Sequence, residues 1–100
     1  TWRTFYDNGQ LETEVNYKQG REEGIGRSFY KNGQLKTKTN YEHGFREGVE
    51  QTFYENGQLE YEISYKNGRE VGRGRMYDKE GKKGLEYNYN NMQTHEFSVE

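Results

Sequence analysis

A unit of 24 residues is written three times in this chain, and a fourth, altered copy follows. The phrase Phe-Tyr-x-Asn-Gly-Gln-Leu begins at Phe5, Phe29 and Phe53, and no insertion or deletion breaks its spacing. A fixed period of this length is the signature of a repeat architecture, in which each unit is one supersecondary element that packs on its neighbours. The sequence therefore predicts one repeat domain, residues 1–100. Its units are 4–27, 28–51, 52–75 and a degenerate cap, 76–100.

The composition indicates a thin but ordered structure. Leu, Ile, Val and Phe together make only 15 of the 100 residues, and Ala, Pro and Cys are absent. Sixteen aromatic residues, ten of them Tyr, take the place of the missing aliphatic ones. A tyrosine can bury its ring while its hydroxyl stays hydrated. The formal net charge is only -2, so the chain lacks the large charge excess that is typical of disordered segments.

Charge and residue usage argue against several classes of partner. Acidic and basic groups are mixed in every unit, so no unit supplies the cationic stripe that nucleic-acid phosphates require. His43 and His95 stand alone, without the converging ligands that a metal site needs. No apolar run approaches the ~20 residues of a membrane-spanning helix. We therefore expect no cofactor, metal, nucleic acid or lipid contact, and the sequence leaves the cellular compartment open.

Each unit has the pattern of a β-hairpin. In the third unit Leu59, Tyr61, Ile63 and Tyr65 alternate with polar residues, which is the period-two pattern of a half-buried strand. A shorter alternating run precedes the Asn-Gly pair of each unit, and Asn-Gly between two such runs is a strong hairpin signal. No segment keeps a helical period. The chain thus predicts an all-β antiparallel meander of about eight or nine short strands.

The length of the hairpin loop decides which side chains share a face. A two-residue loop would place Phe29 opposite Lys36 and mix apolar with charged side chains. A three-residue loop, residues 31–33 with Gly33 in the left-handed conformation, places Phe29 opposite Leu35. Because a slip of one residue turns every side chain to the other face, the amphipathic pattern selects the three-residue loop.

This register predicts an apolar face and a charged face. It places Ile25 opposite Thr39 and gives the first and third units the same pairing as the second. One aromatic side chain per unit then lines the apolar face and is expected to form the core with the Leu, Val, Ile and Tyr residues beside it. These aromatic residues are Phe5, Phe29, Phe53 and Tyr77.

Two sets of positions vary between units in a way that bears on packing and charge. Gly26 and Gly74 fall early in a strand, where a missing side chain lets a neighbouring ring pack over the backbone. Glu50 stands at the same place in the middle unit, which indicates a tolerant position. Paired acids in the first and third units flank a basic pair in the second, which predicts cross-strand ion pairs along the array. The pairs are Glu12/Glu14, Lys36/Lys38 and Glu60/Glu62.

The fourth copy departs from the period and is expected to act as a cap. Lys83 replaces the leucine of the repeated phrase. Residues 94–99, with Phe97 and Val99 on one side, are expected to form a closing strand. At the other end the chain starts inside a hairpin at Trp2, which predicts either a cut end or an open strand edge. The residues that keep the period are Tyr77, Gly81 and Tyr89.

These motifs resemble the MORN repeat family, specifically a bacterial variant found in proteins named as YwqK-type toxin–antitoxin antitoxins. The matching pattern is Phe-Tyr-x-Asn-Gly-Gln-Leu followed by Tyr-x-x-Gly-x-x-x-Gly, as in Phe29–Leu35 and Tyr41–Gly48. The resemblance covers about residues 2–91 and is specific, since three copies are nearly identical. It implies a single-layer, elongated and twisted antiparallel sheet of hairpins. It also implies roles in protein–protein contact and dimerisation.

A second set of tyrosines, one per unit, is the candidate partner-binding surface. In the predicted register they share the charged face with one glutamine per unit. Aromatic residues are favoured anchors at protein interfaces. The alternative is that each ring only shields cross-strand neighbours such as Lys36 or Glu60. The candidate residues are Tyr6, Tyr30, Tyr54, Gln10, Gln34 and Gln58.

Three functions fit this sequence. The first is a non-enzymatic scaffold that binds a protein partner, which the resemblance suggests could be a toxin. The second is a glycan-binding or cell-wall-binding module, because Tyr-rich hairpin repeats also occur in choline-binding and clostridial-toxin repeats. The third is a structural segment that forms a homodimer through an open sheet edge or an apolar face. No serine or acidic pair stands at a spacing typical of catalysis, so we do not expect an enzyme.

Overall fold

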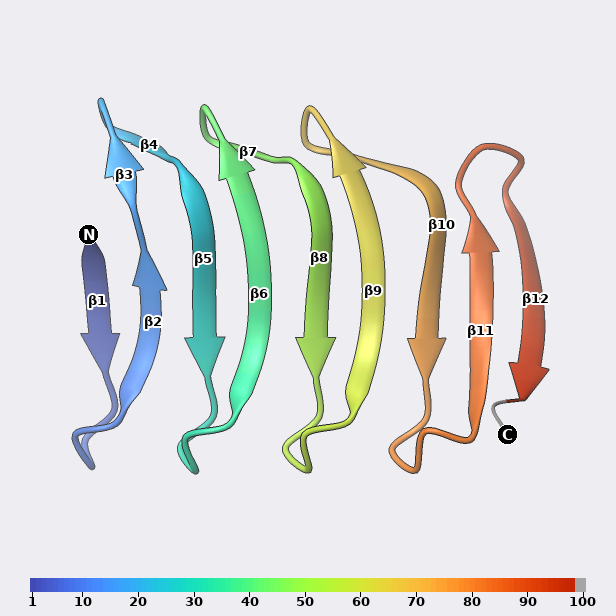
Figure 1. Cartoon of the computed structure of the whole chain (residues 1–100), viewed down its shortest axis with the longest axis horizontal. Helices are drawn as coiled ribbons and strands as arrows, with labels where there is room; N and C mark the ends of the chain where they lie inside the picture. Colours follow the sequence, from blue (N-terminus) through green and yellow to red (C-terminus); the bar gives the residue numbers. More distant parts are fainter. Residues whose placement is uncertain (99–100) are drawn as a thin grey trace.

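The computed structural model describes residues 1–98, which form an antiparallel meander without helices (Figure 1). The strand order of the main sheet is β1-β2-β5-β6-β8-β9-β10-β11-β12, so its strands follow one another in sequence order, while β7 pairs with β6 and β3 pairs with β4 in a separate sheet. The predicted all-β meander is confirmed. The strands are β1 (Trp2–Phe5), β2 (Leu11–Val15), β3 (Tyr17–Lys18), β4 (Arg21–Glu22), β5 (Gly24–Phe29), β6 (Leu35–Glu42), β7 (Phe45–Arg46), β8 (Gly48–Phe53), β9 (Leu59–Lys66), β10 (Arg69–Tyr77), β11 (Lys83–Asn88) and β12 (Gln93–Ser98).

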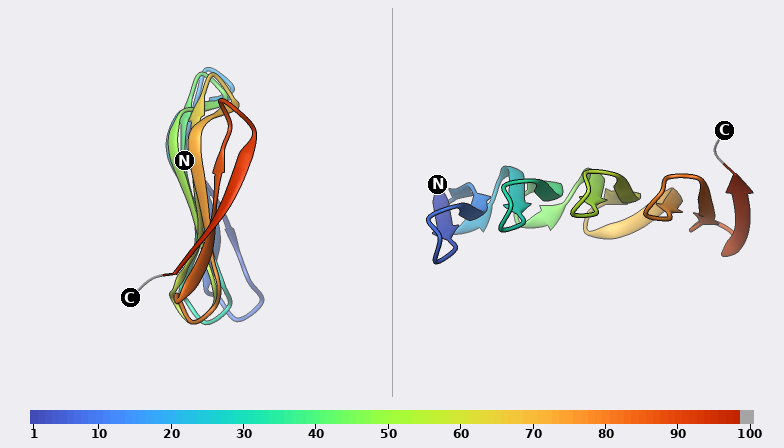
Figure 2. Two further views of the ribbon diagram at one scale, coloured as in Figure 1. Left: turned by 90° about the vertical axis from the view of Figure 1, so that its right-hand side faces the viewer. Right: turned by 90° about the horizontal axis from the view of Figure 1, so that it is seen from below.

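The described chain is one layer thick. Its extents are 38 × 31 × 16 Å, and the view along the sheet edge shows hairpins side by side with no second layer above or below them (Figure 2). The strands rotate progressively across the sheet, as the right-handed twist of L-amino-acid strands requires. A single layer cannot bury both of its faces, so the position of the core depends on which side chains each face carries.

The three-residue hairpin loop is confirmed. The Tyr30 amide donates to the Gln34 carbonyl at 2.8 Å, and the Gly33 amide donates to the Tyr30 carbonyl at 2.9 Å. Gly33 has a φ of 88°, in the left-handed region where glycine is favoured. Phe29 pairs with Leu35, as the amphipathic pattern predicts. The first and third units repeat this geometry.

A β-bulge at the third residue after the loop shifts the rest of each of the first three hairpins. Leu35 pairs with Phe29, but Ser28 pairs with Thr37, so Lys36 has no partner in the register. The predicted pairing of Ile25 with Thr39 is therefore wrong. A bulge adds one residue to one strand and leaves the alternation intact on both sides of it, which is why the sequence pattern did not reveal it. The pair that forms instead is Ile25 with Asn40.

The bulge decides how the two faces of the sheet are composed. We term one side the core face, because its side chains include the most buried ones, and the other side the open face. Since Phe29 follows Ser28 directly in the strand, and Ser28 lies on the core face, Phe29 lies on the open face. The core face holds the buried residues Thr39, Glu50, Thr52 and Tyr65.

The predicted aromatic core is wrong in its location. Phe5 is 59% exposed, and Phe29, Phe53 and Tyr77 are only half-buried. These side chains share the open face with charged residues, whereas the buried side chains of the core face are mostly polar. The predicted separation into an apolar and a charged face is thus replaced by two mixed faces.

The expected packing of rings over glycines is confirmed. A methyl group on Gly26 would lie 3.2 Å from the Tyr41 ring, and one on Gly74 would lie 3.0 Å from the Tyr89 ring. Both rings therefore rest on the backbone of the neighbouring strand, where any side chain would displace them. This contact joins the far end of each hairpin to its own first strand.

The two ends of the sheet differ. β12 forms the closing strand that the sequence predicts over 94–99, although Val99 lies outside the described residues. Phe97 of β12 meets the Tyr77 ring edge-on, with the two ring centroids 5.5 Å apart. At the other end Trp2 of β1 is 60% exposed, and β2 is the strand that pairs with β1 among the described residues.

Candidate partner-binding surface

The predicted tyrosines lie at the hairpin loops and join each repeat to the next. Each stands directly after the first strand of its hairpin, and its hydroxyl donates to a backbone carbonyl of the following repeat. These hydrogen bonds are Tyr6 to Phe29 at 2.6 Å, Tyr30 to Phe53 at 2.7 Å and Tyr54 to Tyr77 at 2.6 Å. Each hydroxyl is therefore already hydrogen-bonded to the next repeat, and the half-buried ring is the part of each tyrosine that is available to a partner.

The loop asparagines reinforce the same connection. Each Asn side-chain oxygen accepts the amide of the glutamine two residues later, which closes the loop as an Asx turn. Each Asn side-chain nitrogen then donates to the loop of the next repeat. These bonds are Asn8 to Lys31 at 3.3 Å, Asn32 to Glu55 at 3.4 Å and Asn56 to Lys79 at 2.9 Å.

The predicted glutamines lie beside the loop glycines of the next repeat. A methyl group on Gly57 would lie 3.7 Å from the side-chain oxygen of Gln34, and one on Gly81 would lie 3.0 Å from that of Gln58. Gln10 lies beside Gly33 in the same way. The structure brings these six residues together in a row at the hairpin-loop end of the sheet. We use the name tyrosine ladder for them: Tyr6, Tyr30, Tyr54, Gln10, Gln34 and Gln58.

Basic side chains cover part of the ladder rings. The Lys36 ammonium lies 5.6 Å from the centroid of the Tyr30 ring, and the Lys31 ammonium lies 5.8 Å from that of Tyr6. Such cation–π contacts at exposed sites contribute about 0.5–1 kcal/mol. The shielding of the Tyr30 ring by Lys36 that the sequence suggests is therefore present.

Local electrostatics favour the protonated form of two ladder phenols. Partial burial raises the pKa of Tyr30 and of Tyr54 above the ordinary value, and the nearby carboxylate of Glu60 raises both further. A phenol acts as a hydrogen-bond donor only in its neutral form. The raised pKa values therefore favour the inter-repeat hydrogen bonds of Tyr30 and Tyr54.

A groove lies beside the ladder between the second and third loops. It has a volume of about 410 Å³ and is lined by Tyr30, Tyr54, Glu55, Asn56 and Lys79. Two aromatic rings, an amide and charges of both signs thus converge on one concave surface. Such a set of groups suits a ligand with apolar and hydrogen-bonding parts.

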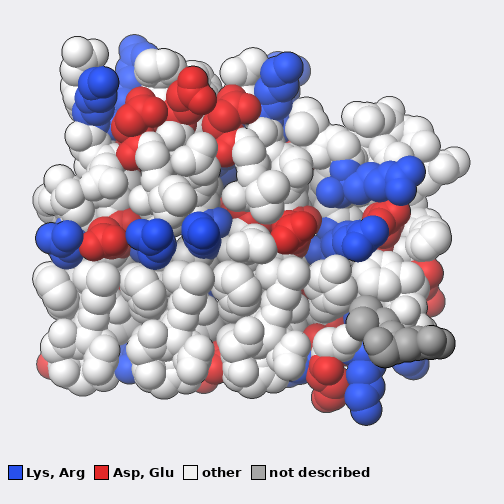
Figure 3. All heavy atoms as spheres, in the orientation of Figure 1, with Lys and Arg blue, Asp and Glu red and all other residues white. Residues whose placement is uncertain are grey.

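A row of charged side chains crosses the open face, and it is visible as alternating colours across the middle of Figure 3. Every member is the register partner of the next. We use the name charge row for Arg3, Glu14, Arg27, Lys38, Gln51, Glu62, Arg75 and Glu86.

Ion pairs form within the charge row, but not between the strands that the sequence suggests. Glu14 lies 2.8 Å from Arg3 and 3.6 Å from Arg27, and Arg75 lies 2.9 Å from Glu86. The predicted bridges between the acidic pairs and the Lys36/Lys38 pair are wrong. The strands that carry these pairs, β2, β6 and β9, are separated from one another by β5 and β8.

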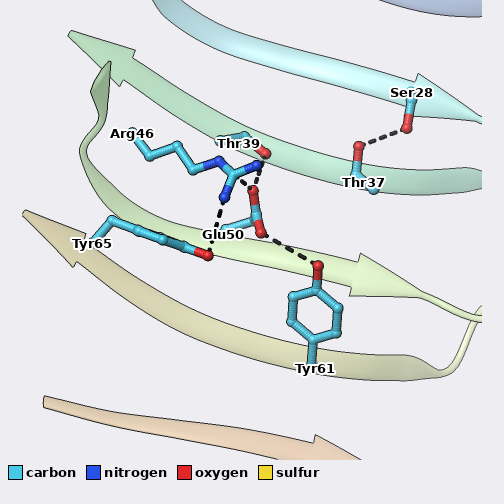
Figure 4. A network of polar contacts seen from close by, with 7 residues as sticks. All are labelled: Ser28, Thr37, Thr39, Arg46, Glu50, Tyr61 and Tyr65. Atoms are coloured by element: carbon cyan, nitrogen blue, oxygen red, sulfur yellow. Dashed lines mark hydrogen bonds and ion pairs between the residues drawn. The ribbon is translucent and has the colours of Figure 1, made fainter. Parts of the chain in front are cut away.

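A polar network occupies the core face of the middle repeat (Figure 4). The Glu50 side chain, only 8% exposed, accepts a hydrogen bond from Thr39 at 2.8 Å and faces the Arg46 guanidinium at 3.4 Å. The Tyr61 hydroxyl donates to the other Glu50 oxygen at 3.4 Å. Arg46 also donates to the Tyr65 hydroxyl at 3.2 Å and lies over its ring.

Sequence reasoning missed this network. Glu50 replaces the glycine of the neighbouring repeats, and we interpreted that change as tolerance. The available signal was a second change four residues earlier, where Arg46 stands in place of glutamate. The flanking repeats combine glutamate with glycine, as Glu22 with Gly26 and Glu70 with Gly74.

Other classes of site have no candidate in the described part of the chain. Residues 1–98 contain no group of three or more potential metal ligands. His43 is exposed and lies 3.7 Å from a Glu23 oxygen, and His95 is an exposed partner of Glu86 on the edge strand. Among the same residues no helix is long and apolar enough to cross a membrane.

The repeat geometry agrees with a comparison against known families. The family profile described as MORN repeat variant matches residues 1–19, 22–43 and 46–67, which is more than half of the chain. The chain belongs to the MORN repeat variant family. MORN repeats are generally interaction and scaffold modules. No curated protein and no solved structure matches the chain significantly.

The MORN matches end before the fourth unit, where the ladder also ends. Asp78 and Glu80 stand where the three MORN repeats have tyrosine and asparagine. The Asp78 carboxylate accepts the Lys82 amide at 2.9 Å and so closes its own loop. This hydrogen bond lowers the pKa of Asp78. The fourth unit is therefore a hairpin without the donors that reach towards a following repeat.

Proposed function

We propose that this MORN repeat protein is a non-enzymatic scaffold that binds a protein partner through the tyrosine ladder. The observation that carries the proposal is the regular row of one half-buried tyrosine ring and one glutamine per repeat at the hairpin-loop end of the sheet. The groove between Tyr30 and Tyr54 adds a concave site of about 410 Å³. Tyrosine is enriched at interfaces because its rigid ring contributes contact area at a small entropic cost.

The array prepares these groups for binding. Because each hydroxyl is held by the next repeat, the ring orientations are already fixed before a partner arrives. Rotamer ordering costs about 0.5–1.5 kcal/mol for each side chain immobilised on binding. The ladder therefore avoids much of that cost, which supports its use as a recognition surface.

The finer proposal is that the partner is a toxin that this protein neutralises by covering its surface. Its support is the resemblance to proteins named as antitoxins. A partner that stops growth when produced alone, and permits growth when this chain is produced with it, would support the neutralising role. Growth arrest that persists in the presence of this chain would contradict it.

A glycan-binding role is the second candidate, and the groove composition favours it. Two tyrosine rings with an asparagine amide beside them, Asn56, can stack on a sugar ring and bond its hydroxyl groups. Titration with cell-wall fragments and a glycan array distinguishes the two roles. Titration curves that show no binding to any sugar would contradict the glycan-binding role and leave the protein-binding role.

The test of the ladder compares two matched double variants. Tyr30→Ala/Tyr54→Ala removes the rings, whereas Tyr30→Phe/Tyr54→Phe keeps the rings and removes only the inter-repeat hydrogen bonds. Each lost hydrogen bond is expected to lower stability by about 0.5–1.5 kcal/mol. Affinity capture followed by mass spectrometry is expected to recover the same partner with the wild type and the Phe variant, and at least tenfold less with the Ala variant.

Circular dichroism provides the control for this comparison, because both variants must retain the β-sheet spectrum. Equal recovery of the partner by the folded Ala variant would contradict binding through the ladder rings. Recovery of no specific protein by the wild type would contradict the scaffold proposal.

A further inference from the structure

We propose that two copies of this chain associate through their open faces, with the two charge rows running in opposite directions. This surface is separate from the tyrosine ladder, and the inference does not depend on the ladder binding a partner. The open face has no second layer over it in the described chain (Figure 2). It carries the charge row and, beside it, an apolar stripe that we define as Phe5, Leu11, Phe29, Leu35, Phe53, Leu59 and Tyr77.

The order of charges in the row is the first argument. From β1 to β11 the side chains are positive, negative, positive, positive, neutral, negative, positive and negative. When the row is placed against its own reversal, each charged residue faces a residue of opposite sign, except that Lys38 faces the neutral Gln51. A second copy with its row reversed thus places an opposite charge against each of six members and joins Lys38 to Gln51. The charged pairs are Arg3 with Glu86, Glu14 with Arg75, and Arg27 with Glu62.

The second unit makes this match possible. The acidic members Glu14, Glu62 and Glu86 recur at the 24-residue period, but Lys38 stands at the corresponding place in the second unit. Lys38 is therefore the register partner of another cation, Arg27. Like charges directly opposite each other destabilise a sheet. Glu62 of a second copy, facing Arg27, would place a further anion beside these two cations.

The apolar stripe obeys the same symmetry. A two-fold axis parallel to the strands, between β6 and β8, reverses the row and leaves each residue at its height along the strand. The stripe of one copy therefore meets the stripe of the other. Phe29 then lies over Leu59 of the second copy, and Leu35 lies over Phe53 of the second copy. Two sheets packed in this way have nearly aligned strands, as in a β-sandwich.

The size of the face is sufficient for a stable dimer. The sheet measures 38 × 31 Å, so covering two thirds of it would bury on the order of 800 Å² per chain, which is the standard size of an interface. Phe5 and Val49 on the open face are 59% and 48% exposed. Their burial would supply the affinity, and the charge row would fix the direction of association.

The test uses two charge reversals near the axis, Arg27→Glu and Glu62→Arg. In a homodimer of either variant, positions 27 and 62 of opposite copies carry like charges at two symmetric contacts. Each variant alone is therefore expected to self-associate at least tenfold more weakly than the wild type. In an equal mixture, each contact between the two variants again joins opposite charges, so a heterodimer is expected. Glu96→Arg, an exposed change on the core face of β12, is the matched control.

Sedimentation equilibrium from micromolar to sub-millimolar concentration measures these masses. The wild type and Glu96→Arg are expected to reach twice the chain mass of 12.0 kDa, the single variants to stay near the monomer mass, and their mixture to regain the dimer mass. A wild type that stays monomeric overturns the proposal. Single variants that still dimerise, or a mixture that stays monomeric, overturn it as well. Circular dichroism confirms that every variant is folded.

Discussion

Replacing Arg46 by glutamate is expected to lower the free energy of unfolding by about 3 kcal/mol. The Glu50 side chain is only 8% exposed, and Arg46 is the cation beside it. Removing one member of a buried ion pair leaves an uncompensated charge, which typically costs about 3–5 kcal/mol. The lower end applies because the Arg46 side chain is 47% exposed, so water can partly replace it.

The midpoint of thermal unfolding reports this loss. A domain of this size loses about 4–8 °C for each kcal/mol, so the variant is expected to melt more than about 10 °C below the wild type. Arg46→Lys is a useful comparison, because it keeps the charge but not the geometry that reaches both Glu50 and Tyr65. It is expected to melt between the other two proteins.

A second substitution is expected to rescue this variant. Arg46→Glu/Glu50→Gly gives the middle repeat the glutamate–glycine combination of its neighbours. The Tyr65 ring can then lie over the glycine, as Tyr41 lies over Gly26. Most of the lost stability is expected to return. A double variant as unstable as Arg46→Glu alone would contradict the role assigned to the buried carboxylate.

Replacing Gly84 by alanine is expected to lower stability by about 2–3 kcal/mol. A methyl group there would lie 2.5 Å from the Met76 carbonyl oxygen and 2.5 Å from the Phe97 ring. The ring could move away, but the carbonyl belongs to the backbone of the adjacent strand. The substitution should therefore push β11 away from β10 and weaken the Tyr77–Phe97 contact.

Hydrogen exchange and chemical denaturation measure this effect. Amide protection is expected to fall in β11, in β12 and at the Met76 end of β10, with little change in β5 or β6. Gly26→Ala is the matched control, because its methyl group would meet the end of a movable Tyr41 ring at 3.2 Å. It is expected to cost less than about 1 kcal/mol. Equal losses for the two alanine variants would show that the backbone contact at Gly84 is not the cause.

The parts of the fold that depend on local chemistry were predictable from the sequence. Asn32-Gly33 predicted the turn, the position of Gly33 predicted a left-handed residue, and the alternation around it predicted the pairing of Phe29 with Leu35. These features are fixed by backbone sterics and by the nearest neighbours in the chain. The repetition of the unit then predicted the whole meander.

The composition of the faces was not predictable in the same way. The residue that bulges, Lys36, leaves an alternating pattern on either side, so the pattern alone could not show that the face changes there. The burial of Glu50 was hidden for a different reason. A carboxylate is almost never fully buried unless it is paired, and its partners Thr39 and Tyr61 lie on neighbouring strands that periodicity does not align residue by residue.

The tyrosine ladder lies between these two cases. The sequence identified its members correctly as a periodic set, but the role of the hydroxyls was missed. The signal was the joint loss of tyrosine and asparagine in the fourth unit, at Asp78 and Glu80. The tyrosine hydroxyl and the asparagine amide donate to the following repeat, so their joint loss in the fourth unit indicated that this contact is their role. Whether the outer edges of the rings bind a partner stays a prediction.

Disulfide formation between introduced cysteines tests the bulged register most directly, and the composition of both faces depends on that register. The Ser28 and Thr37 hydroxyl oxygens lie 2.6 Å apart, and the chain has no cysteine of its own. Ser28→Cys/Thr37→Cys is therefore expected to oxidise rapidly within one chain, whereas Ser28→Cys/Lys36→Cys is expected to stay reduced under the same conditions. Rapid oxidation of the 28/36 pair with no oxidation of the 28/37 pair would contradict the account.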